Sequence, residues 1–359
     1  MLQTESSQSV SALQFQHSLK FTPLLLFPLC PLLAFVFTES TVLAWALPVI
    51  SYVLIPIAEQ FLPQSEDNLS SEDEALLKES PFHKAILLTL LPIQWLLIAL
   101  MVVELQGFSL AMLDARMLGL IASVGITSAV FGINIGHELG HRNDRVSQLA
   151  AKGFLLSTLY LHFIIEHNRG HHRNVATDKD PASAVKGQWV YQFWFQSVIG
   201  SWISAWNLET ARLDKKGLSW WHNEMVHFSL IQGGLLLAIY LGFGLTSMLA
   251  FCVTATIGFL TLETINYVEH YGLRRELQDN GKYERVKPHH SWNCNRNIGR
   301  ILLFELTRHS DHHAYPKREY QILRHHNDAP ELPAGYPAMV LLSLCPPLWF
   351  RVMDHRIPS

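Results

Sequence analysis

The sequence EHNRGHH, residues 166–172, places three histidines and one glutamate within seven consecutive positions. On an α-helix, residues four apart lie on the same side, so His167 and His171 are predicted to face one way. His172 then reaches a second position beside them. A protein core would have to satisfy the ring nitrogens of every buried histidine, and a solvated surface gives no reason to cluster them. The stretch therefore predicts a metal site.

Three further stretches repeat the pattern: HELGH (137–141), NYVEHYG (266–272) and RHSDHHA (308–314). One zinc ion takes at most four protein ligands, so the four stretches together offer too many imidazoles for a single zinc. With no cysteine cluster, they suit two ions of a metal that prefers nitrogen donors and tolerates open positions, and iron fits this description best. The candidate ligands are His137, His141, His167, His171, His172, His270, His309, His312 and His313.

The composition indicates a membrane protein. The 359 residues are 49% hydrophobic and only 16% charged, and the mean hydropathy of +0.16 is too high for an ordinary soluble domain. The net charge of −3 argues against nucleic acid as a partner. No C-x-x-C pair occurs among Cys30, Cys252, Cys294 and Cys345, which fits a reduced cytoplasmic setting.

Apolar runs at about 21–37, 41–62, 85–106 and 116–136, with two more inside 226–265, are each near the ~20 residues that cross a bilayer. We expect an all-α integral membrane protein with six transmembrane helices and a cytoplasmic, histidine-rich di-iron cap. The expected divisions are a loose tail (1–20), four spans (21–136), a cytoplasmic or interfacial segment with the first two clusters (137–225), two spans (226–265) and the rest of the cap (266–359). Residues 65–80 are predicted to be a solvated acidic loop.

The positive charges predict the orientation. With six spans, the connectors at 38–40, 107–115 and 242–246 share one side, and none contains Lys or Arg. Nearly all positive charge falls in 142–225 and 266–359 on the other side, which the positive-inside rule makes cytoplasmic. Both termini and all four clusters are then cytoplasmic. Six of the ten tryptophans fall between 189 and 221, which predicts helices lying in the membrane interface.

Two other kinds of function share parts of this pattern. HELGH alone matches the H-E-x-x-H of zinc metalloproteases, in which Glu138 would be the general base. A protease site needs one metal with an open position, so the further clustered histidines argue against it. A metal transporter would place its ligands near the bilayer midplane, whereas these histidines lie at or beyond the ends of the spans.

The four stretches resemble the histidine boxes of integral-membrane alkane 1-monooxygenases, within the wider group of membrane di-iron desaturases and hydroxylases. NYVEHYG distinguishes the alkane monooxygenases from the desaturases, which lack it. Three connecting stretches also resemble the alkane monooxygenases: ATDKDPASA (176–184), KPHHSWN (287–293) and LPAGYPAMV (332–340). The resemblance is close over about 130–359, with departures such as Arg142, Thr307 and the 63–74 connector. It implies that the nine histidines hold two irons, and that O2 is used to hydroxylate the terminal carbon of a medium- or long-chain alkane.

The resemblance also implies an electron donor, rubredoxin, reduced by an NAD(P)H-dependent reductase, and a location in the bacterial inner membrane. The competing expectation is a related hydroxylase of fatty acyl chains or alkyl-aromatic methyl groups. Carboxylates beside the ligands are expected to accept the distal ring N–H groups: Glu138, Glu166, Glu269 and Asp311. A basic stretch is expected to dock the acidic rubredoxin: Arg274, Arg275, Arg285, Lys287, Arg296 and Arg300.

Terminal selectivity requires shape, because an alkane offers no hydrogen-bonding handle and its end methyl has the strongest C–H bonds. We therefore expect a narrow channel in the helix bundle that presents only the chain end to the metal. Ser51, a small residue among bulky ones in the second span, is a candidate for lining this channel.

Overall fold

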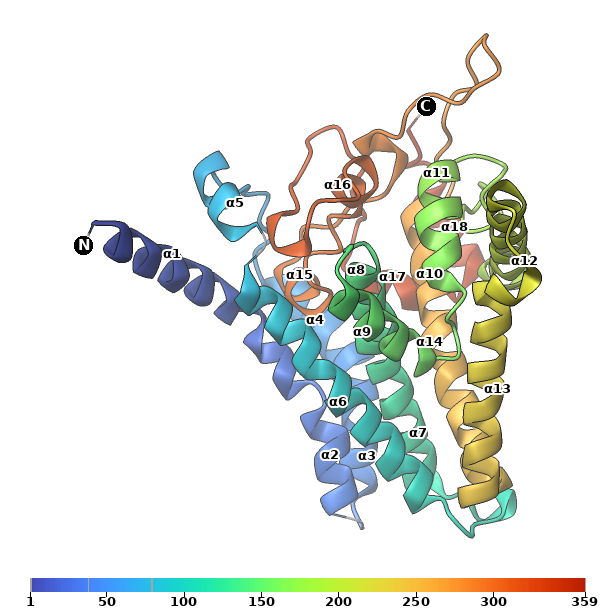
Figure 1. The fold of residues 1–359 in the computed structure, drawn as a ribbon. Coiled ribbons are helices and arrows are strands. Elements are labelled where there is room, and N and C mark those ends of the chain that lie inside the picture. The colour runs from blue at the N-terminus through green and yellow to red at the C-terminus, as the bar shows by residue number, and fades with distance from the viewer. Residues whose placement is uncertain (1, 38, 79, 359) are drawn as a thin grey trace.

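The computed structural model describes residues 2–37, 39–78 and 80–358, and within them the protein is all-helical (Figure 1). Residue 38, the first of the predicted turn at 38–40, lies outside them. The described residues form isolated β-bridges but no strand. The α-helices are α1 (Leu2–Ser18), α2 (Leu29–Val36), α3 (Thr41–Val49), α4 (Ile55–Phe61), α5 (Ser71–Leu77), α6 (Pro81–Glu104), α7 (Ala115–Thr127), α8 (Asn134–Gly140), α9 (Arg145–Leu156), α10 (Phe163–Glu166), α11 (His172–Asn174), α12 (Val190–Lys216), α13 (Glu224–Phe243), α14 (Leu245–His270), α15 (Asn297–Leu302), α16 (His309–Ala314), α17 (Tyr336–Ser343) and α18 (Pro346–Met353).

Six helical stretches are long and apolar enough to cross a membrane, as predicted, so the chain is a multi-pass membrane protein. They are Val10–Val36, Thr41–Phe61, Pro81–Glu104, Ala115–Gly140, Glu224–Phe243 and Leu245–His270. The apolar patch near the C-terminus forms two short helices, α17 and α18, with Pro346 and Pro347 in the first turn of α18. Eight residues in each are too few to span a bilayer.

Two expectations about loose segments are wrong. The predicted tail at 1–20 is helical from Leu2 to Ser18, and the first span begins inside it. Packing orders its end, because the His17 ring contacts His83 at the start of α6 with 3.0 Å between ring nitrogens. In the acidic connector, Ser71–Leu77 form helix α5 rather than a loop, whereas most residues of the connector are exposed, as predicted. Glu74 of this helix pairs with Arg324 and Leu77 is buried, so these tertiary contacts hold the helix in place.

The second and fourth spans are not regular α-helices. Short π-helical turns interrupt them at Ile50–Leu54 and Ser128–Ile133. Such turns insert one extra residue into a helix and are frequent at functional sites. Both turns lie against the cavity described below.

The four histidine stretches fold together at one end of the bundle, which we call the cap, residues 137–223 and 266–358 (Figure 1). The buried carboxylate of Glu305 fastens the cap to the first span, because it pairs with Lys20 and with Arg300. Its neighbour Phe304 and Glu305 itself have φ values of 52° and 56°, in the left-handed region that non-glycine residues rarely adopt. The ion pairs hold this conformation directly before the fourth histidine stretch.

Helix α12 crosses the end of α13 at the cap side (Figure 1). Large side chains are exposed along it, among them Tyr191, Phe195 and Trp202, and the exposed rings of Trp220 and Trp221 stack with centroids 3.8 Å apart beyond its end. An apolar, aromatic surface at the end of the membrane spans is what an interfacial helix requires, and interfacial placement of α12 stays a prediction.

Candidate metal centre

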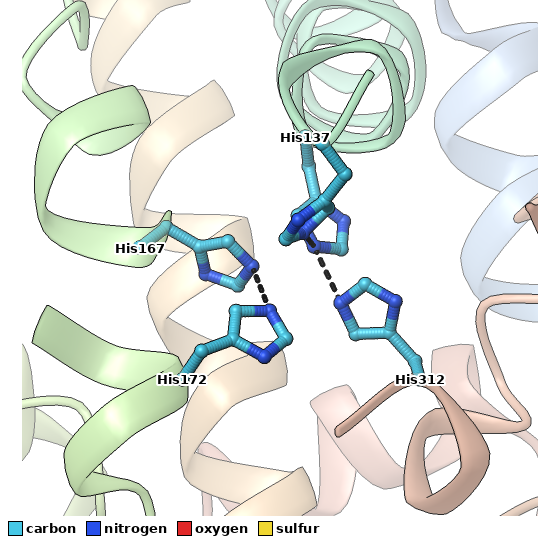
Figure 2. Close-up of side chains that lie close together, drawn as sticks. His137, His167, His172 and His312 are labelled. Atoms are coloured by element: carbon cyan, nitrogen blue, oxygen red, sulfur yellow. Dashed lines mark hydrogen bonds between the residues drawn. The ribbon is translucent and has the colours of Figure 1, made fainter. Parts of the chain in front are cut away.

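Five histidines from three separate segments direct their Nε2 atoms into one space. His137 and His141 come from the end of the fourth span, His167 and His172 from the turn between α10 and α11, and His312 from α16. The Nε2 atoms of His137 and His312 are 2.9 Å apart, and those of His167 and His172 are 3.0 Å apart. Figure 2 shows the rings of these four histidines turned toward one another. We call this set the five-histidine group.

Four buried histidines form a second set beside the first, which we call the four-histidine group: His171, His270, His309 and His313. The Nε2 atom of His309 is 2.8 Å from that of His313 and 3.2 Å from that of His270. His171 approaches His313 at 3.3 Å. All nine predicted histidines are thus brought together, five in one group and four in the other.

The local geometry of EHNRGHH differs from the prediction of an ordinary α-helix. Residues His167–His171 form a π-helical turn, in which the N–H of His172 donates to the carbonyl oxygen of His167 five residues earlier. Residues five apart, not four apart, therefore point the same way. His172 joins His167 in the five-histidine group, and His171 turns into the other group. Glycine leaves room beside this turn for the Glu166 carboxylate, since a Cβ on Gly170 would lie 2.2 Å from Glu166 Oε1.

The two groups fit metal ions. Burial, followed by neighbouring imidazoles, holds the pKa of His167, His172 and His312 well below its ordinary value. The rings are therefore neutral, which is the form that binds a metal. Several neutral Nε2 atoms facing one space cannot all donate hydrogen bonds to each other, and a cation between them satisfies their lone pairs. The distal Nδ1 atoms of His172 and His312 also have no partner among the described residues.

The carboxylates expected to accept the distal ring N–H groups do so at none of the four positions, and only Glu269 contacts a ring of either group. Glu269 Oε2 lies 3.1 Å from His309 Nε2, and it therefore meets the nitrogen that faces the group rather than the distal one. Glu138 instead accepts from Arg142 at 3.2 Å. Glu166 accepts from Ser204, and Asp311 from Arg318 and His326. Consecutive residues on a helix point in different directions, so the neighbour of a ligand faces away from the site.

Asp180 has the role that was expected of those carboxylates. Its Oδ2 accepts a hydrogen bond from the distal Nδ1 of His171 at 2.9 Å, and its Oδ1 accepts from the Ala182 N–H at 3.1 Å. Although burial opposes charge on His171, the Asp180 carboxylate raises the pKa of that ring. The contact fixes which His171 nitrogen carries the proton and turns Nε2 toward the group. Within ATDKDPASA no sequence signal separated Asp180 from the exposed Asp178.

A mostly apolar cavity leads from the bundle to both groups. Side chains of the second, fourth and sixth spans form its walls, and His137, His167, His309 and Glu269 line its end. Ser51 lies in the π-helical turn of the second span and lines this cavity, with its hydroxyl unpartnered among the described residues. The wall residues include Tyr52, Ile55, Ile126, Ala129, Val130, Ile133, Leu262, Ile265, Leu302, Leu306 and Val340.

The six basic residues expected to dock a protein partner do not form one exposed patch. Arg275 and Arg296 donate to the carbonyl oxygens of Arg173 and Glu59, at 2.9 and 2.7 Å, and Arg300 pairs with Glu305. Arg275 and Arg300 hold parts of the cap together, and Arg296 joins the cap to the second span. Arg285 and Lys287 are exposed, and Arg274 is half-buried.

Comparison with known proteins gives a consistent set of relatives. The model of a family described as fatty acid desaturase matches residues 115–343. The chain is 40% identical to alkane 1-monooxygenase 2 of Pseudomonas aeruginosa, over 88% of its own length and 84% of the relative's. It is 37% identical to alkane 1-monooxygenase of Acinetobacter baylyi, over 86% of this chain and 76% of the relative. It is 30% identical to the hydroxylase component of the xylene/toluene monooxygenase of Pseudomonas putida, over 80% of this chain and 77% of the relative.

Proposed function

Because the chain belongs to the fatty acid desaturase family and, within it, to the alkane 1-monooxygenases, we propose that it hydroxylates the terminal carbon of medium- or long-chain n-alkanes with O2. The observation that carries this proposal is the apolar cavity of the membrane spans, which ends on histidines of both groups. A hydrocarbon reaches the centre without leaving apolar surroundings, and its end is the part that arrives first.

The protein's own residues position the alkane and keep water away from the centre, whereas the metal, when bound, would activate O2. We assign two irons, one to the five-histidine group and one to the four-histidine group, because neutral imidazole donors suit iron. Ile133, Leu262 and Leu306 of the cavity wall exclude water and restrict the substrate to an extended chain. Such a wall confers selectivity for the terminal carbon by shape alone, as an alkane has no polar group to bind.

Product analysis tests the proposal directly. Purified protein loaded with iron and given a reductant should convert n-alkanes to 1-alkanols, and under 18O2 the hydroxyl oxygen should carry the label. Internal alcohols should be minor products. Unlabelled alcohol, or labelled alcohols spread along the chain, would contradict terminal monooxygenation.

One alternative substrate class is favoured by a specific observation, the relationship to the xylene/toluene monooxygenase component. Methyl groups on aromatic rings could be presented to the same centre if the cavity admits a ring. A fatty acid is disfavoured, because no Arg or Lys lines the cavity among the described residues and Glu269 would repel a carboxylate. A panel of alkanes, alkylbenzenes and fatty acids of matched length separates the three.

Electrons have to come from another protein, and we assign this role to rubredoxin with an NAD(P)H-dependent reductase. The cap is assigned to the cytoplasmic side of a bacterial inner membrane, because positive charge gathers in the cap segments. At the opposite end, Arg116 is largely neutralised by its ion pair with Glu104, at 2.8 Å. The weak positive charge there agrees with this orientation.

Ser51→Trp is expected to shorten the longest alkane that the enzyme accepts. The side chain lines the cavity and an indole would occupy the space that a long chain needs. Terminal selectivity and iron content should not change, since no ligand is touched. Val53→Trp is the matched control, because Val53 lies two residues along the same span but is 47% exposed on its outer surface.

The measurement is the product yield across a series of n-alkane lengths for the wild type and both variants. If Ser51→Trp, with normal expression and iron, gives the same chain-length profile as Val53→Trp, Ser51 does not limit the substrate.

A further inference from the structure

Two of the nine histidines are not fully buried. His141 and His172 are half-buried, and both belong to the five-histidine group, whereas all four members of the second group are buried. Both also line one open cleft on the cap, which we call the histidine cleft. The turn after α8 forms one wall of this cleft, and the segment after α16 forms another. At this cleft an aqueous partner comes within contact distance of the metal-facing rings.

The histidine cleft has a basic lining. Lys152, Arg169 and Lys317 line it together with a single acid, Glu224. Lys152 pairs with Glu224 at 3.2 Å. Arg169 pairs at 2.6 Å with Glu209, a carboxylate that Arg212 also binds, so two guanidinium groups share one acid and the lining keeps a net positive charge. Lys317 is exposed and pairs with no acid among the described residues. Between the cations, Asn143, Gln148 and Asn168 supply uncharged polar groups.

Two other openings do not offer the same access. The apolar cavity reaches His137, His167 and His309 but from within the membrane spans, where a water-soluble protein cannot approach. A further cleft beside α12 reaches Asp180 but no histidine of either group. The exposed residues Arg285 and Lys287, which the sequence suggested for docking, line none of these three openings.

We infer that the histidine cleft is the docking site of a small acidic one-electron donor protein, and that electrons enter through the rings of His141 and His172. The inference rests on the proposed function, which requires an external donor. Electron transfer slows steeply with distance through protein, so a donor centre seated over these two rings has a short route. The basic lining attracts an acidic partner and orients it during the encounter.

The electron balance requires two encounters in each turnover. Each encounter oxidises one donor molecule by one electron and delivers that electron to the centre. Two electrons and two protons then convert one oxygen atom of O2 to water, while the other enters the C–H bond of the alkane. The donor must leave after giving one electron. Electrostatic contacts at an exposed rim form and break readily, so they suit such a site.

Lys317→Glu and Asn143→Trp test the docking site in two independent ways. Lys317→Glu reverses an exposed charge at the cleft, and Asn143→Trp adds bulk at its exposed rim. Rubredoxin binding to the metal-free full-length protein in lipid nanodiscs is measured first, at low and at physiological ionic strength. Each variant should weaken binding, Lys317→Glu by about tenfold at low ionic strength and less once salt screens the charge.

Turnover is then measured with rubredoxin and, separately, with a small chemical reductant. The variants should raise the KM for rubredoxin and leave turnover with the chemical reductant unchanged. Lys216→Glu, which reverses an exposed charge at the end of α12, is the control and should behave as wild type.

The inference is overturned if both cleft variants bind rubredoxin as tightly as the wild type, and all the more if Arg285→Glu weakens binding instead. Failure of the proposed function has a different signature, since wild-type protein would then hydroxylate no alkane with either reductant.

Discussion

Replacing His312 by Ala is expected to abolish alkane hydroxylation and to lower the iron content from close to two ions per chain to close to one. His312 Nε2 lies 2.9 Å from His137 Nε2 in the five-histidine group, and α16 supplies no other ring to that group. His171→Ala should do the same to the four-histidine group, which has one donor fewer to begin with. The fold should persist in both variants, because the six spans do not depend on one ligand.

The measurements are iron per chain, turnover, and helix content by circular dichroism in the same preparations. His222→Ala is the matched control, because His222 is exposed and belongs to neither group. A wild-type preparation that is fully active with one zinc per chain would refute the assignment. So would a His312→Ala protein that keeps two irons and full turnover.

Asp180→Asn is expected to weaken metal binding at the four-histidine group by about 10–100-fold. The carboxylate accepts from His171 Nδ1 at 2.9 Å and is itself held by the Ala182 N–H, so it sets the orientation of the ring. An amide has nearly the same shape, but it loses the negative charge that favours a proton on Nδ1. The ring is then less firmly held with Nε2 toward the group.

Iron affinity should be measured by competition with a chelator, because activity alone does not separate weak binding from poor turnover. Asp178→Asn is a close control, since Asp178 lies two residues away with its side chain 83% exposed. Equal affinities in the two variants would remove Asp180 from the support of the centre.

Features with a regular period could be predicted from sequence. The six spans follow from apolar length, and HELGH, on the last turn of a span, placed His137 and His141 in one group. EHNRGHH also predicted a metal site, but its α-helical period placed His167 and His171 on the same side, whereas the π-helical turn places His172 beside His167. The π-helical turn has no signature in the sequence pattern. Its surroundings are tertiary contacts, since Glu166 packs beside Gly170 and accepts a hydrogen bond from Ser204.

Contacts between distant segments could not be predicted. Glu138, Glu166 and Asp311 were chosen because they adjoin ligands in the chain, yet adjacency on a helix directs side chains apart. Asp180 meets His171 because the chain turns back on itself after α11, and its Oδ1 is held by the Ala182 N–H within that turn. The same limit applies to the basic residues, of which Arg275, Arg296 and Arg300 form hydrogen bonds or ion pairs with other segments or residues of the protein.

The unequal origin of the two groups has a consequence for biogenesis. Four donors of the five-histidine group (His137, His141, His167 and His172) have been synthesised once the ribosome passes residue 172. The four-histidine group then has only His171 and waits for three donors from the last third of the chain: His270, His309 and His313. With one ion assigned to each group, as proposed above, we expect a nascent chain to bind its first ion long before translation ends, and the second only after nearly the whole polypeptide has been synthesised. On this assignment, the order of the donors along the chain sets the order in which the two groups become able to bind metal.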